Sequence, residues 1–252
     1  MTVTYELRNG IAWLTINRPE ARNSLDKAVR DGLFEGVRRF NDDDAAKVLV
    51  LTGAGDKAFC AGGDLKEMSA TQLTIPPLDF VPQFGRNIMV DKPTIAAVNG
   101  VAFAGGFLLA QTCDLCIAAT TAQFGITEVK VGRGSPWAAP LPLMIPRRVA
   151  MELALTGSPM SAQRAYEIGF VNRLAEPSDL RTVTQAFAEQ IATNAPLSVA
   201  AGKATVTLTA EYPLSQAFES AETLWAPVYL SDDAQEGMAA FRDKRTPVWK
   251  GS

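Results

Sequence analysis

Two pairs of adjacent glycines lie where a short apolar segment gives way to a helix-forming one. One pair is in AFCAGGDLKEM, residues 58–68, and the other is in NGVAFAGGFLLAQ, residues 99–111. Peptide N–H groups at the start of a helix have no partner inside it, so each turn offers free hydrogen-bond donors. Two such turns can present two N–H groups to one oxygen, which stabilises a developing oxyanion. Glycine also serves turns that have no chemical role, and the spacing alone leaves that alternative open.

Acid–base chemistry has to come from side chains other than histidine, because the 252 residues contain none. This excludes Ser–His and Cys–His nucleophile pairs and the HExxH zinc site. No GxxxxGK[ST] loop is present, and no GxGxxG motif follows a strand. The sequence therefore gives no support to nucleotide hydrolysis or to a dinucleotide cofactor. Carboxylates, Lys, Tyr and Cys remain as proton carriers.

Cys113 and Cys116 form a CxxC motif, which raises the question of a redox or metal site; the third cysteine is Cys60. The surrounding segment LLAQTCDLCIAAT is apolar on both sides, and a metal site would need a second pair of ligands. We therefore interpret these cysteines as small buried hydrophobic residues, and we expect neither a metal site nor a disulfide.

Composition indicates an ordinary globular chain of 27.0 kDa, with 47% hydrophobic residues and a formal net charge of −3. The balance is slightly acidic and predicts neither a nucleic-acid partner nor an anionic membrane surface. No apolar run reaches the ~18 residues of a spanning helix, and the first residues, MTVTYELRNG, lack the pattern of a signal peptide. We expect a cytoplasmic protein.

The order of elements predicts an α/β core up to about residue 130. Asn9-Gly10 separates two apolar runs and predicts a β-hairpin, and residues 24–40 carry apolar side chains at helical spacing after Asn23 or Ser24 as a cap. Further strands are predicted in KVLVLTG, TIAAVNG and DLCIAAT, with a helix in AGGFLLAQTC. Residues 70–85 lack a period and contain two adjacent prolines, so we expect a mobile loop or a short helix beside a binding site.

From Arg147 onward the sequence predicts mostly helices. RRVAMELALTG and SAQRAYEIG each end in the glycine expected after a helix, and FVNRLAE predicts a short strand. The remaining helices are predicted in SDLRTVTQAFAEQIATN, LSVAAGKATVTLTA, PLSQAFESAETLWAPVYLS and DDAQEGMAAFRDKR. No flexible linker separates the two halves, so this tail is expected to pack on its own core or on a neighbouring subunit.

Five segments together resemble the crotonase superfamily, the enoyl-CoA hydratase/isomerase family. They are INRPEARNSLD, AFCAGGDLKEM, KPTIAAVNGVAFAGGFLLAQTCDL, AQFGITEVKVG and LTGSPMSAQRAYEIGFVNRL, and the likeness runs from about Val3 to Lys250. The resemblance implies an α/β fold in which ββα units form a spiral over residues 1–195. Residues 196–252 would form a C-terminal helical region that assembles trimers or pairs of trimers.

The resemblance also implies a set of site residues. The amides of Gly63 and Gly105 would bind the thioester oxygen of an acyl-CoA, which is the substrate and carries coenzyme A; no separate cofactor is expected. Coenzyme A would lie mainly against backbone near the first glycine turn, at Ala21, Arg22, Ala61, Asp64 and Leu65. Phe241 and Lys244 would meet its adenine and phosphates from a neighbouring subunit, unless they form an ordinary solvated last helical turn.

The sequence departs from the family's usual pair of glutamates. Leu108 stands where the first would be, whereas the second matches Glu128 in FGITEVKVG. Without the resemblance, Glu128 would be interpreted as a surface residue at a strand end. The following segment replaces a glycine-rich run and contains Trp137, which either lines the acyl pocket or fills the core, with Arg133 and Ser135 as further polar groups.

These residues predict an enzyme that stabilises a thioester enolate, with Glu128 as the catalytic acid–base group. Hydration of a 2-enoyl-CoA is the primary hypothesis, because one carboxylate can take a proton from water and return it to carbon. A Δ3-Δ2 enoyl-CoA isomerase needs the same single proton carrier. A subunit that binds acyl-CoA without hydrating it is the alternative outside enzymes.

Overall fold

The computed structural model describes all 252 residues and contains two β-sheets. The first sheet has six strands and is parallel except for its edge strand, which forms the predicted hairpin with its neighbour. In spatial order these strands are β1 (Val3–Arg8), β2 (Ile11–Ile16), β3 (Val48–Gly53), β5 (Thr94–Val98), β7 (Leu115–Ala119) and β10 (Arg173–Ala175). Asn9 and Gly10 both have positive φ, as a two-residue hairpin turn requires. All residues of β3 and β5 are buried, as expected for strands covered on both faces.

A second, smaller sheet contains four short strands. They are β4 (Ala58–Cys60), β6 (Val101–Phe103), β8 (Gln123–Gly125) and β9 (Met160–Ser161). Each chain turn gives one strand to the first sheet and the next to the second: β3 is followed by β4, β5 by β6, and β7 by β8. After the second strand comes a helix, which is α2 (Leu65–Ala70) in one unit and α3 (Gly105–Thr112) in the next. The predicted spiral of ββα units is therefore confirmed.

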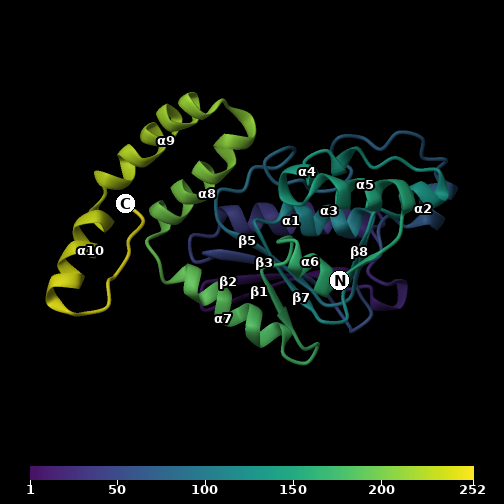
Figure 1. Cartoon of the computed structure of the whole chain (residues 1–252). Coiled ribbons are helices and arrows are strands. Elements are labelled where there is room, and N and C mark those ends of the chain that lie inside the picture. Colours follow the sequence, from purple (N-terminus) through teal and green to yellow (C-terminus); the bar gives the residue numbers. More distant parts are fainter.

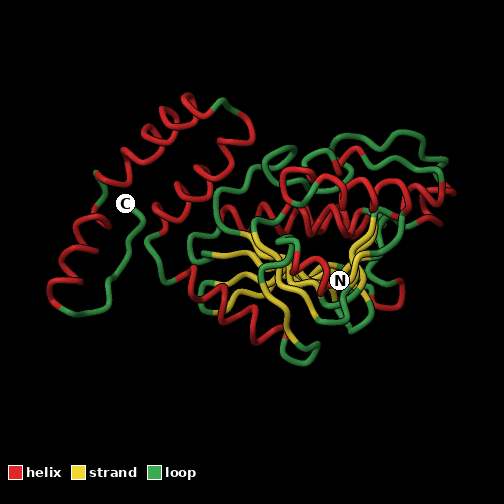
Figure 2. Tube along the Cα trace, viewed as in Figure 1, coloured by secondary structure: helices red, strands yellow, loops and turns green.

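Helices cover both faces of the first sheet (Figures 1 and 2). α7 (Leu180–Ala192) lies on one face, where Gln185 accepts a hydrogen bond from the Trp13 indole at 2.8 Å. α1 (Lys27–Asp42) lies on the other, and the next residue along β2, Leu14, leaves no room for a Cβ on Gly36. The remaining short helices of this part are η1 (Pro19–Ala21), η2 (Thr127–Val131), η3 (Pro136–Ala138), α4 (Leu141–Met144), α5 (Arg147–Thr156) and α6 (Ala162–Glu167).

The predicted cap of α1 is wrong. The helix begins later than expected, and the side chain of Asp26 accepts from the Val29 N–H at 2.9 Å. Asn23 is instead fully buried, has φ of 56°, and donates to the carbonyls of Ala54 and Ala58. Its side chain therefore ties two loops together and is not free to cap a helix.

Residues 71–93 form neither a strand nor a helix, so the alternative of a short helix is wrong and that of a loop is confirmed. Asn87 organises the loop by donating to the carbonyls of Leu78 and Val81. Whether the loop is mobile stays a prediction.

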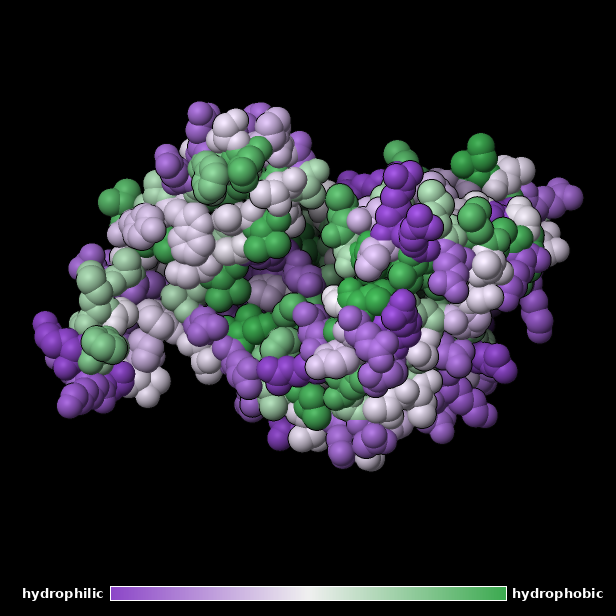
Figure 3. Space-filling view, in the orientation of Figure 1, coloured by the Kyte–Doolittle hydropathy of each residue, from purple (hydrophilic) through white to green (hydrophobic).

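The chain ends in three helices that project from the sheets as an arm (Figure 1). They are α8 (Pro196–Glu211), α9 (Leu214–Tyr229) and α10 (Asp232–Asp243). Large apolar side chains gather on the surface of this arm (Figure 3), among them Phe218, Leu230 and Phe241, which are 64%, 87% and 88% exposed. Lys203 of α8 attaches the arm to the core, because its ammonium donates to the Val90 and Lys92 carbonyls and pairs with Asp114 at 2.9 Å.

The three cysteines are buried, as predicted for small hydrophobic residues. Burial raises the pKa of the Cys60 thiol to about 12 and also raises that of Cys113 and Cys116. None of the ten α-helices combines the length and apolarity that crossing a bilayer would require.

Candidate active site

The amides of Gly63 and Gly105 lie next to each other because they follow neighbouring parallel strands, β4 and β6. A Cβ placed on Gly105 would be 3.9 Å from the Gly63 nitrogen. Gly105 is the first residue of α3, so its N–H has no partner within the helix. The hydrogen bonds that join the first turn to Leu25 use the Gly62 carbonyl and the Asp64 N–H, and leave the Gly63 N–H out. The structure thus brings two unpaired donors together, as an oxyanion site requires.

Glycine is needed here for close packing as well. A Cβ on Gly106 would be 2.0 Å from the Cys60 carbonyl oxygen, so α3 starts in direct contact with the end of β4. The residue before α3, Ala104, has φ of 51° and ψ of −120°, a conformation that is strained for any residue with a Cβ. Its own N–H donates to the Gly125 carbonyl at 2.9 Å, which ties this turn to the strand that precedes Glu128.

Glu128 lies in the short helix η2 and is only 8% exposed, so its interpretation as a surface residue at a strand end is wrong. One carboxylate oxygen, Oε1, accepts from the Trp137 indole N–H at 2.8 Å, whereas Oε2 is buried without a partner. Because an indole N–H only donates, it cannot take a proton from Oε1. Oε2 is therefore the oxygen at which this carboxyl can gain and lose a proton.

Burial raises the pKa of Glu128 above its usual value. Its own backbone N–H and the Trp137 indole act in the opposite direction, because both stabilise the charged form by hydrogen bonding. A carboxyl with a raised pKa can serve as a base and then as an acid closer to neutral pH than an exposed glutamate.

Trp137 fills the core, as one of the two alternatives for it predicted, whereas a role in lining the acyl pocket stays a prediction. Its ring packs against Phe107 with 5.7 Å between centroids, which places it in the core, and its N–H contacts the candidate proton carrier. Its backbone carbonyl accepts a hydrogen bond from Gln111 at 2.9 Å. Gln111 was not among the residues predicted from the sequence, although a polar residue in the apolar run GFLLAQTC is a detectable signal.

Leu108 is 6% exposed and gives the site no carboxylate where the family's first glutamate would be. It lies three residues after Gly105 in α3, so the two positions are neighbours one helical turn apart.

Two adjacent turns bring together the residues predicted to hold coenzyme A. The Ala61 N–H donates to the Arg22 carbonyl at 3.0 Å, and Ala21 is the last residue of η1 just before it. Asp64 accepts from two N–H groups of α2 and pairs with Arg18 at 3.2 Å, so its side chain is already bonded within the chain. Leu65 is 58% exposed. Backbone and an exposed apolar side chain are thus what this region offers a ligand.

Phe241 and Lys244 are not part of this arrangement within one chain. They lie at the end of α10 in the projecting arm (Figure 1), where Lys244 has φ of 52° and forms the helix C-cap.

Arg133 fastens the 71–93 loop to the segment after η2. Its guanidinium donates to the carbonyls of Leu73 and Thr74 at 2.9 and 3.1 Å. Ser135 precedes η3 and makes no capping bond with its side chain.

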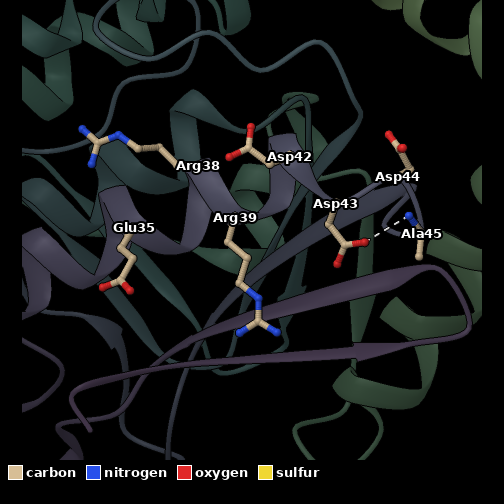
Figure 4. Close-up of a pocket in the computed structure, with 7 residues that line it drawn as sticks. All are labelled: Glu35, Arg38, Arg39, Asp42, Asp43, Asp44 and Ala45. Atoms are coloured by element: carbon tan, nitrogen blue, oxygen red, sulfur yellow. Dashed lines mark hydrogen bonds between the residues drawn. The ribbon is translucent and has the colours of Figure 1, made fainter.

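A separate surface hollow of about 700 Å³ lies at the end of α1 (Figure 4). Six of its seven lining residues are charged: Glu35, Arg38, Arg39, Asp42, Asp43 and Asp44. Such a lining does not suit an acyl chain, and none of the predicted site residues contributes to it.

Comparison with known proteins agrees with the fold and with this site. The family model for enoyl-CoA hydratase/isomerase matches residues 6–252. The chain is 41% identical to the (E)-benzylidenesuccinyl-CoA hydratase of Thauera aromatica over 100% of both chains, and 38% identical to the carnitinyl-CoA dehydratase of Salmonella typhi over 97% of both. A crystal structure of an enoyl-CoA hydratase from Mycobacterium marinum superposes with a TM-score of 0.88 at 40% identity, covering 100% of this chain and 99% of that one.

The fold and the paired amides define an enzyme class that works on acyl thioesters. Within it, the chain belongs to the enoyl-CoA hydratase/isomerase family, the crotonase superfamily. It is a hydratase-type acyl-CoA enzyme and therefore a lyase.

Proposed function

We propose that this enzyme adds water to a 2-enoyl-CoA and that Glu128 is the only carboxylate that moves protons. The observation that carries this proposal is the buried and unpartnered Oε2 of Glu128. The adjacent amides of Gly63 and Gly105 support it, since the Ala104 N–H bond to the Gly125 carbonyl ties their turn to the strand before Glu128. Leu108 supplies no second carboxylate. The relatives' printed activities, a hydratase and a dehydratase, support addition and removal of water.

The reaction then proceeds in two proton transfers. The thioester oxygen accepts hydrogen bonds from the Gly63 and Gly105 amides, which stabilise negative charge on it. Glu128 Oε2 takes a proton from water while the water oxygen bonds to the β-carbon, and the electrons of the double bond move to give the enolate. The same Oε2 returns that proton to the α-carbon as the thioester carbonyl re-forms, which restores the carboxylate.

Isomerisation of a 3-enoyl-CoA is the second candidate, favoured by the single carboxylate. There Glu128 would remove a proton from the α-carbon of the 3-enoyl thioester to give a conjugated dienolate, and would return the proton to the γ-carbon to give the 2-enoyl thioester. The alternative of a subunit that only binds acyl-CoA is not supported, because the relatives' printed activities are those of enzymes.

One experiment separates hydration from isomerisation. Intact enzyme and Glu128→Gln are given a panel of 2-enoyl and 3-enoyl thioesters, and the conjugated thioester absorbance and the product mass are followed. We expect wild type to hydrate 2-enoyl substrates. The variant should hydrate them about 10²–10⁴-fold more slowly while it still binds the ester. Turnover of 3-enoyl substrates alone would assign an isomerase, and binding without any turnover would overturn the proposal.

We further propose that coenzyme A lies along Ala21, Arg22, Ala61, Asp64 and Leu65, and that residues 196–252 assemble a trimer or a pair of trimers. Support comes from the exposed apolar residues of the arm, including Phe218 and Leu230. In such an assembly Phe241 and Lys244 would reach coenzyme A bound by a neighbour. A cytoplasmic location is proposed on the strength of the three unpaired cysteines.

Sedimentation of the purified chain tests the assembly, with three or six copies as the expected result and a stable monomer as the contrary one. If a trimer forms, Lys244→Ala should raise KM for the thioester several-fold and leave kcat nearly unchanged.

A further inference from the structure

Gln111 is a buried polar side chain that the proposed reaction does not use. It is 6% exposed and lies on α3, whose other buried residues are Gly106, Phe107, Leu108, Leu109 and Ala110. Its Nε2 donates to the Trp137 carbonyl at 2.9 Å, and its Oε1 is buried without a partner. If the amide were flipped, Gln111 Oε1 would meet the Trp137 carbonyl oxygen, and two acceptors cannot bond. The Trp137 carbonyl therefore fixes Nε2 toward itself and Oε1 away from itself. The chain therefore holds a hydrogen-bond acceptor in a fixed orientation inside an apolar region.

The position of Gln111 relates this acceptor to the acyl group. α3 starts at Gly105, and Gln111 follows six residues later, about 9 Å along the helix axis. Side chains on a helix lean toward its N-terminus, which brings the amide back toward the Leu108 turn. Trp137 contacts Gln111 through its carbonyl and Glu128 through its indole, so the acceptor belongs to the same cluster as the proton carrier. Gln111 Oε1 and Glu128 Oε2 are therefore two buried acceptors without partners that are linked through one tryptophan.

We propose that Gln111 determines substrate specificity by accepting a hydrogen bond from a donor on the distal part of the acyl group. The preferred substrates are then 2-enoyl thioesters that carry a hydroxyl or an amide N–H beyond the double bond. This inference rests on the proposed hydration and adds the substrate class. A buried acceptor without a donor is unfavourable, so a purely alkyl acyl group binds less well. A substrate carboxylate at the same place also binds less well, because its oxygens are acceptors like Gln111 Oε1.

The test uses pairs of 2-enoyl thioesters of equal length, in which a methyl at successive positions beyond the double bond is replaced by hydroxyl. We expect wild type to prefer the hydroxyl member of one pair by about tenfold or more in kcat/KM. Gln111→Met keeps a side chain of similar length without the acceptor, and should reduce that preference to near unity. The kcat/KM of Gln111→Met should fall far more for the hydroxyl member than for the methyl member.

Two further measurements keep the outcomes distinct. Trp137→Phe retains the carbonyl that orients Gln111, so it should slow both members of the pair and leave their ratio unchanged. Binding of the corresponding saturated thioesters, measured by calorimetry, should show the same preference even if hydration itself fails, which would overturn the proposed function and leave this inference standing. No preference at any position in wild type, or equal losses on both members in Gln111→Met with its melting temperature retained, would mean that a water satisfies the amide and that Gln111 is structural.

Discussion

The hydrogen bond between Trp137 and Glu128 makes one oxygen of the carboxylate a fixed acceptor and leaves the other to react. Because the indole stabilises the charged form, it lowers the Glu128 pKa against the larger, opposing effect of burial. In the proposed hydration the reaction begins from the carboxylate, which must accept a proton from water. On that proposal the indole extends activity toward lower pH.

Trp137→Phe should move the acid limb of the kcat/KM profile to higher pH. The variant keeps the aromatic packing against Phe107 but removes the donor, so the Glu128 pKa rises and less carboxylate is present near neutrality. Initial rates across pH, with wild type in the same buffers, measure the shift. An unchanged acid limb, or one displaced to lower pH, would contradict this role for the indole.

At the residue scale, the sequence predicted which residues form the candidate site better than it predicted the hydrogen bonds between them. Gly63, Gly105 and Glu128 were identified because they match motifs, and the structure brings the two glycines together. The Trp137 and Gln111 hydrogen bonds could not be foreseen, since they join residues from separate turns whose distance depends on packing. The role of Asn23 as a tie between loops was missed for the same reason.

The start of α3 depends on a contact between elements, because Gly106 meets the end of β4 with no space for a side chain. A methyl group there would force the helix and the strand apart. Since Gly105 is the adjacent residue, such a shift would also displace one of the two amides from the other.

Gly106→Ala should destabilise the enzyme by about 3 kcal/mol and lower kcat more than the loss of folded protein explains. Gly202→Ala, on α8, is the matched control: a Cβ there meets nothing within 4 Å, and removing a helical glycine should stabilise by about 0.5–1 kcal/mol. Urea unfolding and initial rates of both variants provide the comparison. Equal stability of the two would show that the contact at Gly106 relaxes without cost.

The elements of the first sheet and of the helical half were predictable, whereas the strands of the second sheet were not. The strands of the first sheet and the helices from Arg147 onward carry clear apolar patterns, and the structure has elements there. The second sheet is built from strands of two or three residues, such as β4 and β9, which are too short to show a period. These strands exist because a neighbour pairs with them, which is information that a local pattern does not contain.

At the scale of the whole molecule, Lys203 joins the C-terminal arm to the sheets. Its ammonium reaches two carbonyls just before β5 and a carboxylate just before β7, and its side chain is 18% exposed. The partners belong to the loops that lead into central strands. Loss of this contact should therefore loosen the arm without unfolding the spiral.

Lys203→Met should lower the free energy of unfolding by about 2–3 kcal/mol, because it leaves buried carbonyls and Asp114 with fewer partners. Lys27→Met is the control. Lys27 pairs with Asp31 one turn along the helix, and an exposed pair of this kind contributes about 0.3–0.5 kcal/mol to stability. Denaturant titration with hydrogen exchange of the arm amides measures both effects. Equal losses of stability in the two variants would show that Lys203 does not attach the arm to the core.

The pairing of β4 with β6 has a consequence for how this enzyme tolerates insertions and deletions. The two amides follow neighbouring strands, so their separation reflects the spacing between hydrogen-bonded strands, about 4.8 Å in any sheet. The 71–93 loop lies between them in sequence but does not set that distance. Insertions and deletions can thus change the length of the loop while the spacing of the two amides is inherited unchanged.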